Sequence, residues 1–337
     1  MTTQEYFENL LDKINLRLGD EERNFIEEKQ NALREKLRGK LSLQDDFLTG
    51  SYKRHTIIKP KSDDEKFDVD VFVAFDKEEY GDSELVDLRQ AAVDTLHEIR
   101  SENGDLGITT INEEQRRSVR VEFGNNFQID IVPAVQIEKD KLYKIFDRRT
   151  LEAVKSNPKL HGELLSKANE DTGGLLVPLI KILKAWKREK CDYVKSFHIE
   201  LMAVKIFTGT TIESLPKGLL AFFESAGDYF SNACLKDPAN TEMLIDEYLD
   251  KDGTREQICS LVETEKTVAK AAVEADESGD DDEAVEAWEK VFADSDSETA
   301  KAVREGSFYA GAGGAVIKTN TSQHDTNRIN SPRSWRQ

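Results

Sequence analysis

The feature that most constrains the fold is the run Phe67–Phe75, in which two aspartates alternate with apolar residues. The run is rich in β-branched and aromatic side chains, which favour a strand. Successive side chains of a strand point to opposite faces, so Asp68 and Asp70 are expected on one face while the valines between and after them face the core. The sequence therefore predicts a sheet that is apolar on one face and has a pair of carboxylates on the other.

A third carboxylate, Asp130, lies in a second apolar run, Gln128–Val132. Strands at Ser118–Phe123 and Phe127–Val132 are expected to form a hairpin that turns at Gly124-Asn125-Asn126 and ends at Pro133. Such a hairpin can bring Asp130 beside the first pair. The simpler interpretation is that all three are solvated aspartates on amphipathic strands.

Neighbouring carboxylates repel one another and are stable together only beside a positive charge. Hard divalent cations such as Mg²⁺ prefer oxygen ligands of this kind. A two-metal site for phosphoryl transfer fits the pattern, with Asp68 and Asp70 bridging both ions and Asp130 completing the catalytic one. Gly50 and Ser51, just upstream, can hold phosphate through backbone N–H groups and a hydroxyl.

The sequence pattern predicts both strands and helices before about Asn157 and mainly helices after it. We expect one long helix from Thr3 to about Arg38, a loop containing Gly50, and a helix at Leu85–Arg100. The pattern is mainly helical from Asn157 to about Leu261, most clearly at Leu175–Arg188. The later expectations are a solvated acidic loop between two helices (Asp276–Glu283) and an extended or flexible tail (Gly311–Gln337).

Charge and cysteine content limit the function classes. The net charge of −19 argues against a general grip on nucleic acid, which relies on Lys and Arg, and suits nucleotides that arrive with magnesium. Cys191, Cys234 and Cys259 are far apart in the sequence, which argues against a disulfide scaffold and favours a reducing cytoplasm. No apolar run is long enough to suggest a membrane span, so no membrane partner is expected.

The order Gly50-Ser51, Asp68-x-Asp70 and a distant Asp130 resembles the signature of the polymerase-β-like nucleotidyltransferase superfamily. Two longer segments resemble the bacterial cGAS/DncV-like nucleotidyltransferases (CD-NTases). The first is Leu48–Pro60. The second is Leu179–Trp186 with Ser196–Leu201, which is similar to the family's LxKxW … S-Y/F-H-x-E pattern.

The resemblance implies an α+β fold, in which a nucleotidyltransferase core with a mixed sheet packs on a helical C-terminal lobe across a cleft. The expected parts are a long N-terminal helix (1–44), the catalytic core (45–156), the helical lobe (157–310) and the tail (311–337). It also implies that Lys184 and Ser196 contact the nucleotide triphosphate.

The activity implied is the joining of nucleoside triphosphates, ATP with GTP or another nucleotide, into a cyclic di- or trinucleotide second messenger in anti-phage (CBASS) signalling. Two Mg²⁺ ions, replaceable by Mn²⁺, would serve as cofactors. Accessory or regulatory proteins from the same defence operon are expected as partners, and a stable nucleic-acid partner is not.

Several of these residues also have simpler interpretations. Lys184 belongs to a series with Lys181 and Lys187 that could be a solvated basic edge on a core helix. Trp186 and His198 are expected to be packed core residues. The arginines beside the expected hairpin either contact phosphates or are exposed; they are Arg116, Arg117 and Arg120.

Two other functions fit part of the pattern. A nucleotidyltransferase that acts on RNA ends or on a small molecule such as an aminoglycoside would share the three aspartates. An inactive nucleotide-binding or scaffold protein of the same superfamily would lack one of them, and all three are present here.

Overall fold

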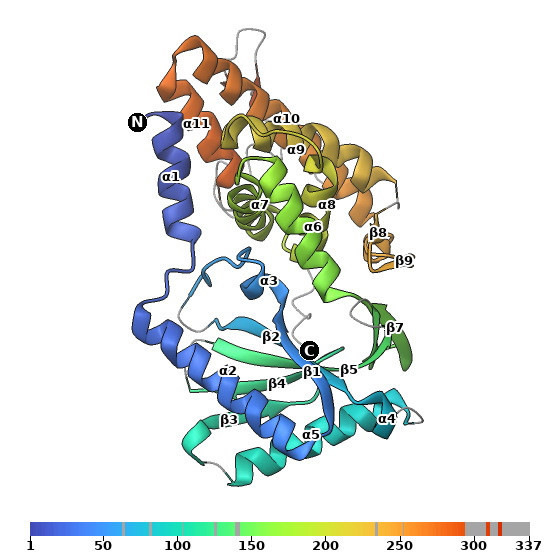
Figure 1. The fold of residues 1–337 in the computed structure, drawn as a ribbon. Coiled ribbons are helices and arrows are strands. Elements are labelled where there is room, and N and C mark those ends of the chain that lie inside the picture. The colour runs from blue at the N-terminus through green and yellow to red at the C-terminus, as the bar shows by residue number, and fades with distance from the viewer. Residues whose placement is uncertain are drawn as a thin grey trace, which may run out of the picture. The chain divides into compact units, whose positions relative to one another are not determined.

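The structure is a computed structural model that describes residues 1–62, 65–80, 83–102, 104–124, 127–138, 142–232, 235–251, 253–293, 308–310 and 316–318. The chain forms two compact units, and Figure 1 labels the helices and strands of each. The sheet unit comprises Leu16–Leu165 with 238–241. The helical unit comprises Met1–Asn15, Ser166–Asp237 and the described residues from Glu242 onward. The expected boundaries at 44, 156 and 310 stay a prediction.

The sheet unit is built on seven strands in the order β1-β2-β5-β4-β3, with β6 on the later half of β5 and β7 beside β6. The strands are β1 (Leu43–Thr49), β2 (Phe67–Phe75), β3 (Ile108–Asn112), β4 (Val119–Phe123), β5 (Phe127–Glu138), β6 (Leu142–Asp147) and β7 (Glu152–Ser156). β2 and β5 are parallel, and the other pairs are antiparallel. The sheet is therefore mixed, as the resemblance implies.

The helices and short elements complete the chain. They are α1 (Thr3–Ile14), α2 (Asp20–Lys40), α3 (Gly50–Lys53), α4 (Lys77–Tyr80), α5 (Leu85–Glu102), α6 (Pro158–Asp171), α7 (Leu176–Lys190), α8 (Ser196–Phe207), α9 (Leu215–Ser231), α10 (Thr254–Ser278) and α11 (Asp281–Phe292). The 3₁₀ turns are Gly104–Leu106 and Glu247–Leu249, and the short strands are β8 (Lys236–Asp237), β9 (Asn240–Leu244), β10 (Phe308–Ala310) and β11 (Val316–Lys318).

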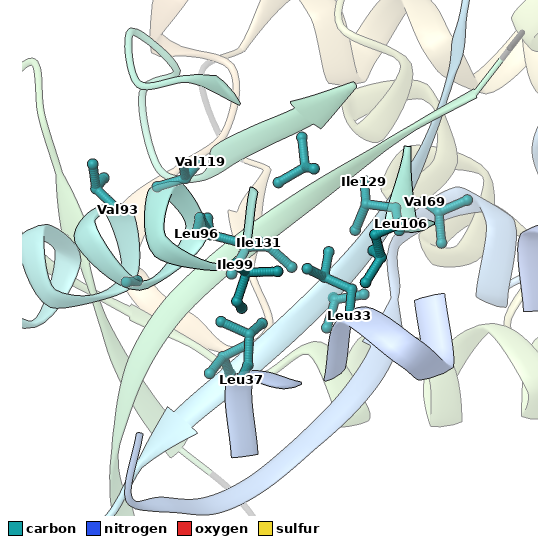
Figure 2. Packing of buried hydrophobic residues seen from close by; sticks show 14 of the residues in the cluster. Leu33, Leu37, Val69, Val93, Leu96, Ile99, Leu106, Val119, Ile129 and Ile131 are labelled. Carbon is teal, nitrogen blue, oxygen red and sulfur yellow. The ribbon is translucent and has the colours of Figure 1, made fainter. Parts of the chain in front are cut away.

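One face of the sheet packs against α2 and α5 (Figure 2). Leu33 and Leu37 of α2 and Leu96 of α5 join Val69 and Ile129 of the two central strands, and all five are buried. Along β2 the residues at alternate positions are buried in this core, whereas Asp68 and Asp70 are only half-buried. The predicted strand at 67–75 and its two-sided character are confirmed, because a strand alternates its side chains between faces.

Three local expectations are wrong. The long N-terminal helix is interrupted between Ile14 and Asp20, so that α1 and α2 belong to different units. Gly50 does not lie in a loop: it begins α3 directly after strand β1, which the sequence analysis did not predict. Pro133 does not end its strand, because the register of β5 with β4 stops at Ile131 and that with β6 starts at Ala134. A residue without an N–H is tolerated at such a change of partner.

Most other expectations are confirmed. The helices at 85–100 and 175–188 are α5 and α7, and β4 and β5 form the predicted hairpin. Its turn residues Asn125 and Asn126 lie outside the described residues. Two helices flank the acidic segment as expected, but the loop predicted over Asp276–Glu283 is wrong. Helix α10 continues to Ser278 and α11 begins at Asp281, so only Gly279 and Asp280 separate them. The expected tail lies outside the described residues except for β11.

The helical unit buries an aromatic core. The Trp288 ring of α11 lies 5.1 Å from that of Phe7 in α1, and the Trp186 ring of α7 lies 5.1 Å from that of Phe223 in α9. Trp186 is thus the core residue that the sequence analysis expected. None of the helices within the described ranges is both long and apolar enough to span a bilayer.

Candidate active site

The three predicted aspartates lie together on the face of the sheet opposite α2 and α5. Asp70 of β2 is the register partner of Asp130 in β5, and Asp130 is in turn opposite Arg120 of β4. Asp68 lies two residues before Asp70 on the same face. Directly paired residues of neighbouring strands present their side chains to one face, so the register alone brings these four side chains together.

Arg120 forms a fork with Asp130. Its Nε donates to Asp130 Oδ1 at 2.9 Å, and its Nη2 donates to Asp130 Oδ2 at 3.0 Å. The same Nη2 donates to Asp68 Oδ1 at 3.0 Å, and Gln128 Nε2 donates to that oxygen at 2.6 Å. Two of the three carboxylates are therefore joined by one guanidinium.

Burial and repulsion between carboxylates disfavour the charged forms of Asp68 and Asp70. Burial, followed by the charge of Asp130, raises the pKa of Asp68 above its usual value. Burial and the charges of Asp130 and Asp68 raise the pKa of Asp70 to about 7, although Arg54 and Arg120 oppose the shift. Carboxylates with raised pKa values are short of positive charge, as the sequence analysis predicted for a metal site.

Gly50 is shaped to lie against Asp70. Its φ of +72° belongs to the left-handed region, which side chains other than glycine rarely adopt. A Cβ at this position would lie 1.7 Å from Asp70 Oδ2. The glycine thus meets two requirements at once, backbone conformation and space beside a carboxylate. Ser51, the next residue, is half-buried in the four-residue helix α3, and its role towards phosphate stays a prediction.

The donor set suits a divalent metal in its chemistry, although not in its present side-chain positions. Three carboxylates on one face, two of them with raised pKa values, are hard oxygen ligands that need a cation. Within the described ranges, however, no three or more His, Cys, Asp or Glu side chains are arranged to hold an ion. Asp68 and Asp130 are turned to Arg120 instead, so metal binding requires them to change partner.

The other two predicted site residues belong to the helical unit. Lys184 of α7 is buried, and its Nζ donates to Glu200 Oε2 of α8 at 2.9 Å. Ser196, the first residue of α8, is exposed. Lys184 and Glu200 are the lysine and glutamate of the LxKxW … S-Y/F-H-x-E pattern, so the pattern includes a buried ion pair. That they contact nucleotide stays a prediction.

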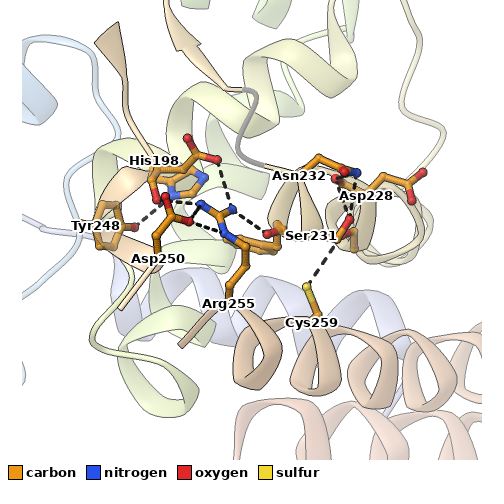
Figure 3. A network of polar contacts seen from close by, with 11 residues as sticks. His198, Asp228, Ser231, Asn232, Tyr248, Asp250, Arg255 and Cys259 are labelled. Carbon is orange, nitrogen blue, oxygen red and sulfur yellow. Dashed lines mark hydrogen bonds and ion pairs between the residues drawn. The ribbon is translucent and has the colours of Figure 1, made fainter. Parts of the chain in front are cut away.

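His198 is a packed residue, as expected. It is buried, and its Nδ1 lies 2.9 Å from the Tyr248 hydroxyl (Figure 3). The same hydroxyl accepts the backbone N–H of Lys195. Burial, with Arg255 and Lys195 nearby, lowers the pKa of His198 to about 3, so the ring is neutral. The sequence analysis did not single out Tyr248.

The arginines near the hairpin divide into two groups. Arg120 joins the carboxylates, whereas Arg116 and Arg117 bind the buried Asp147 of β6. The sequence analysis left Arg120 undecided and did not consider Gln128. A signal existed for Arg120, because residues equally far from a hairpin turn lie opposite each other, and Arg120 and Asp130 are equidistant from Asn125.

Comparison with known proteins decides the family. Residues 1–169 match the Second Messenger Oligonucleotide or Dinucleotide Synthetase (SMODS) domain, which is half of the chain. The chain belongs to the SMODS family. All three aspartates, together with Gly50 and Arg120, lie within the matched residues.

Related sequences agree with this assignment. A cyclic AMP-AMP-AMP synthase from an Acinetobacter species is 29% identical over 216 residues, which cover 61% of this chain and 59% of the relative. A CBASS oligonucleotide cyclase, CdnC of Escherichia coli, is 26% identical over 180 residues, which cover 52% of this chain and 55% of the relative. The chain therefore spans less than two thirds of the length of these SMODS relatives.

Solved structures show the same fold. The structure of CdnC from E. coli MS115-1 with ATP matches 88% of this chain and 98% of that chain, with a TM-score of 0.67 and 19% identity. The Vibrio cholerae DncV cyclic AMP-GMP synthase matches 76% of this chain and 70% of that chain, with a TM-score of 0.57 and 15% identity. The predicted α+β fold of the bacterial CD-NTases is confirmed.

Proposed function

We propose that this protein is a metal-dependent nucleotidyltransferase that joins nucleoside triphosphates into a cyclic di- or trinucleotide and releases pyrophosphate. The observation that supports it most is the register Asp70–Asp130, with Asp68 on the same face and Gly50 against Asp70. The names of the SMODS relatives, a cyclic AMP-AMP-AMP synthase and an oligonucleotide cyclase, support the cyclic product. ATP is the first substrate to test, and GTP the second.

In this proposal Asp68 and Asp70 are ligands of two Mg²⁺ ions, and Asp130 is a ligand of the catalytic one; Mn²⁺ is expected to substitute. Bound there, the ions would lower the pKa of the attacking hydroxyl and offset charge on the leaving pyrophosphate. Gly50 lets the backbone lie directly against Asp70. The Ser51 hydroxyl is the proposed donor for a phosphate at the site.

Lys184 and Ser196 are proposed to contact the triphosphate, by resemblance to the CD-NTases. For Lys184 this requires that its amine leave Glu200, to which it donates at 2.9 Å. Lys181, one turn earlier on α7, donates to the neutral side chain of Asn15 at 2.8 Å. Because no carboxylate must be given up in that bond, Lys181 is the second lysine of α7 to test for phosphate binding.

The biological setting is also a proposal. We propose CBASS anti-phage signalling in the cytoplasm, with accessory proteins from the same operon as partners. The name of one relative, a CBASS oligonucleotide cyclase, supports this setting. A solved complex of E. coli CdnC contains HORMA-deltaN, which makes a HORMA protein one candidate partner. With a net charge of −19, no stable nucleic-acid partner is proposed.

The test is a product assay without primer. The pure protein is incubated with each nucleoside triphosphate and with their mixture, with Mg²⁺ or Mn²⁺, and the products are identified by mass spectrometry. A cyclic oligonucleotide that disappears in the variant carrying both Asp68→Asn and Asp70→Asn is expected. Transfer to an RNA end or to a small molecule in place of cyclisation would favour the first alternative. No transfer at all, with nucleotide still bound, would favour a scaffold.

A further inference from the structure

Arg120 is placed where a cation is needed. Its guanidinium uses Nε and Nη2 to hold both oxygens of Asp130 and one oxygen of Asp68. The Arg120 side chain is 22% exposed and that of Asp130 10% exposed, so these bonds are partly shielded from water. Charge-assisted forks of this kind are among the stronger hydrogen bonds in proteins.

The position of this guanidinium follows from the sheet and not from a flexible loop. Arg120 and Asp130 are paired inside the β4–β5 ladder. The next pair on the same face, two residues closer to the hairpin turn, is Glu122 with Gln128. Glu122 in turn binds Lys66 at 2.8 Å. Arg120 therefore faces the carboxylates in any state in which the sheet is folded.

Two other cations of the described residues lie near the site. Arg54 attracts Asp70 electrostatically, whereas Lys66 is matched by Glu122. Asp68, Asp70 and Asp130 together bring three negative charges to one sheet face. Arg120 bonds to two of them, and its three bonds occupy carboxylate oxygens of the proposed metal ligands.

We propose that Arg120 is an internal competitor of the divalent metal: it occupies the carboxylates when no metal is bound and must release Asp68 and Asp130 for metal to bind. The inference rests on the metal dependence in the proposed function. Arg120 thereby lowers the affinity of the free protein for metal. Loading then depends on a bound nucleotide, whose phosphates supply further oxygen ligands for the incoming ions.

The experiment measures metal binding directly, without turnover. Mn²⁺ is titrated into nucleotide-free protein by calorimetry and followed by electron paramagnetic resonance, for the wild type, Arg120→Gln and Arg120→Lys. Arg117→Gln is the matched control, because Arg117 also binds a buried carboxylate of this sheet but not one of the three aspartates. Melting temperatures with and without Mn²⁺ are recorded in parallel.

We expect Arg120→Gln to bind Mn²⁺ about tenfold more tightly than the wild type, since the competing fork is gone. Its metal-free form should melt at a lower temperature, and Mn²⁺ should raise that temperature by more than it does in the wild type. Arg120→Lys, which keeps the charge but not the fork, should lie between the two. Arg117→Gln should keep the affinity of the wild type.

Unchanged or weaker Mn²⁺ binding in Arg120→Gln would overturn the inference. If that variant does not fold, Arg120→Lys decides, and an affinity equal to or below that of the wild type overturns it. Absence of Mn²⁺ binding in both the wild type and Arg120→Gln also overturns it. By contrast, a wild type that binds Mn²⁺ but makes no product contradicts the proposed function and leaves the role of Arg120 standing.

Discussion

Two carboxylate sites in the sheet unit differ in how their negative charge is balanced: one is the single Asp147, and the other is the set of three aspartates of the candidate active site. Asp147, at the end of β6, is completely buried and accepts bonds from Arg116 Nε at 2.8 Å and Arg117 Nε at 2.9 Å. One carboxylate thus has two guanidinium groups. On the other side of the comparison are Asp68, Asp70 and Asp130, of which Asp68 and Asp130 share the bonds of one arginine, Arg120.

The pKa values move in opposite directions as a result. Burial alone would raise the pKa of Asp147, but the bonds from Arg116 and Arg117 outweigh it and lower that pKa to about 2. For Asp70, burial and two neighbouring aspartates raise the pKa to about 7. A carboxylate that supports the fold is supplied with positive charge by the chain itself. The three aspartates are left short of it, which suits a site that takes a cation from outside.

The largest expected effect is on synthesis. Changing both Asp68 and Asp70 to Asn removes two anionic ligands but keeps the shape, so product formation should fall by about 10³-fold or more. Because mutual repulsion is also removed, the metal-free melting temperature should not fall. Mass spectrometry measures the product, and thermal denaturation of the same sample measures the melting temperature. Loss of product through unfolding would contradict the comparison.

An ion pair in the helical unit, in which one cation matches one carboxylate, should lose stability when its carboxylate is removed, unlike the aspartates of the sheet. Lys184 and Glu200 have side chains that are 5% and 4% exposed. Glu200→Gln removes the carboxylate that faces the buried Lys184 ammonium group. The free energy of unfolding, measured in urea, should therefore fall by about 3 kcal/mol. The double variant Lys184→Met with Glu200→Leu should recover most of that loss. If Glu200→Gln leaves stability unchanged and alters only nucleotide binding, Lys184 is a substrate contact and not a structural ion.

Gly50→Ala tests the contact with Asp70. Gly50 and Gly107 share a φ of +72°, but a Cβ at Gly107 meets no heavy atom within 4 Å. Both alanine variants should therefore lose about 1–2 kcal/mol of stability from backbone strain. Only Gly50→Ala should also displace Asp70, with about 10²-fold less product. Equal activity in the two variants would show that the contact with Asp70 is unimportant.

The smallest effect is the pH dependence of stability. The pKa of Asp147 falls from its usual 3.8 to about 2 on folding, so its stabilisation is complete above about pH 4 and is lost as the pH falls towards 2. Asp147→Asn should abolish that slope and cost about 2 kcal/mol at neutral pH.

Asp70 should show the reverse slope. Its pKa is higher folded than unfolded, so its contribution to the stability of the metal-free protein should fall as the pH rises from about 4 to 7, and Asp70→Asn should lose less stability over this range than the wild type. Urea denaturation of the wild type, Asp147→Asn and Asp70→Asn from about pH 2 to about pH 7, with a metal chelator present, measures both slopes. Slopes of the same sign for the two positions would remove the distinction between them.

Local pattern was enough to predict much of the fold. Alternation in Phe67–Phe75 identified β2 and the face of its aspartates, and the turn at 124–126 identified the β4–β5 hairpin. It was not enough for the N-terminal segment, where apolar spacing continues past the break between Ile14 and Asp20. That break separates residues that pack in different units, which no local period records.

The sequence by itself determined the kind of chemistry available, because side-chain alternation in a strand is a property of the backbone and puts Asp68 and Asp70 on one face wherever the strand lies. It also determined the family resemblance. Only the tertiary structure decided how charge is balanced: Asp147 has two arginines, Asp68 and Asp130 share Arg120, and Lys184 is paired with Glu200. Those pairings depend on strand register and helix packing between residues distant in the chain, and the pKa of a carboxylate depends on what lies within a few ångströms of it.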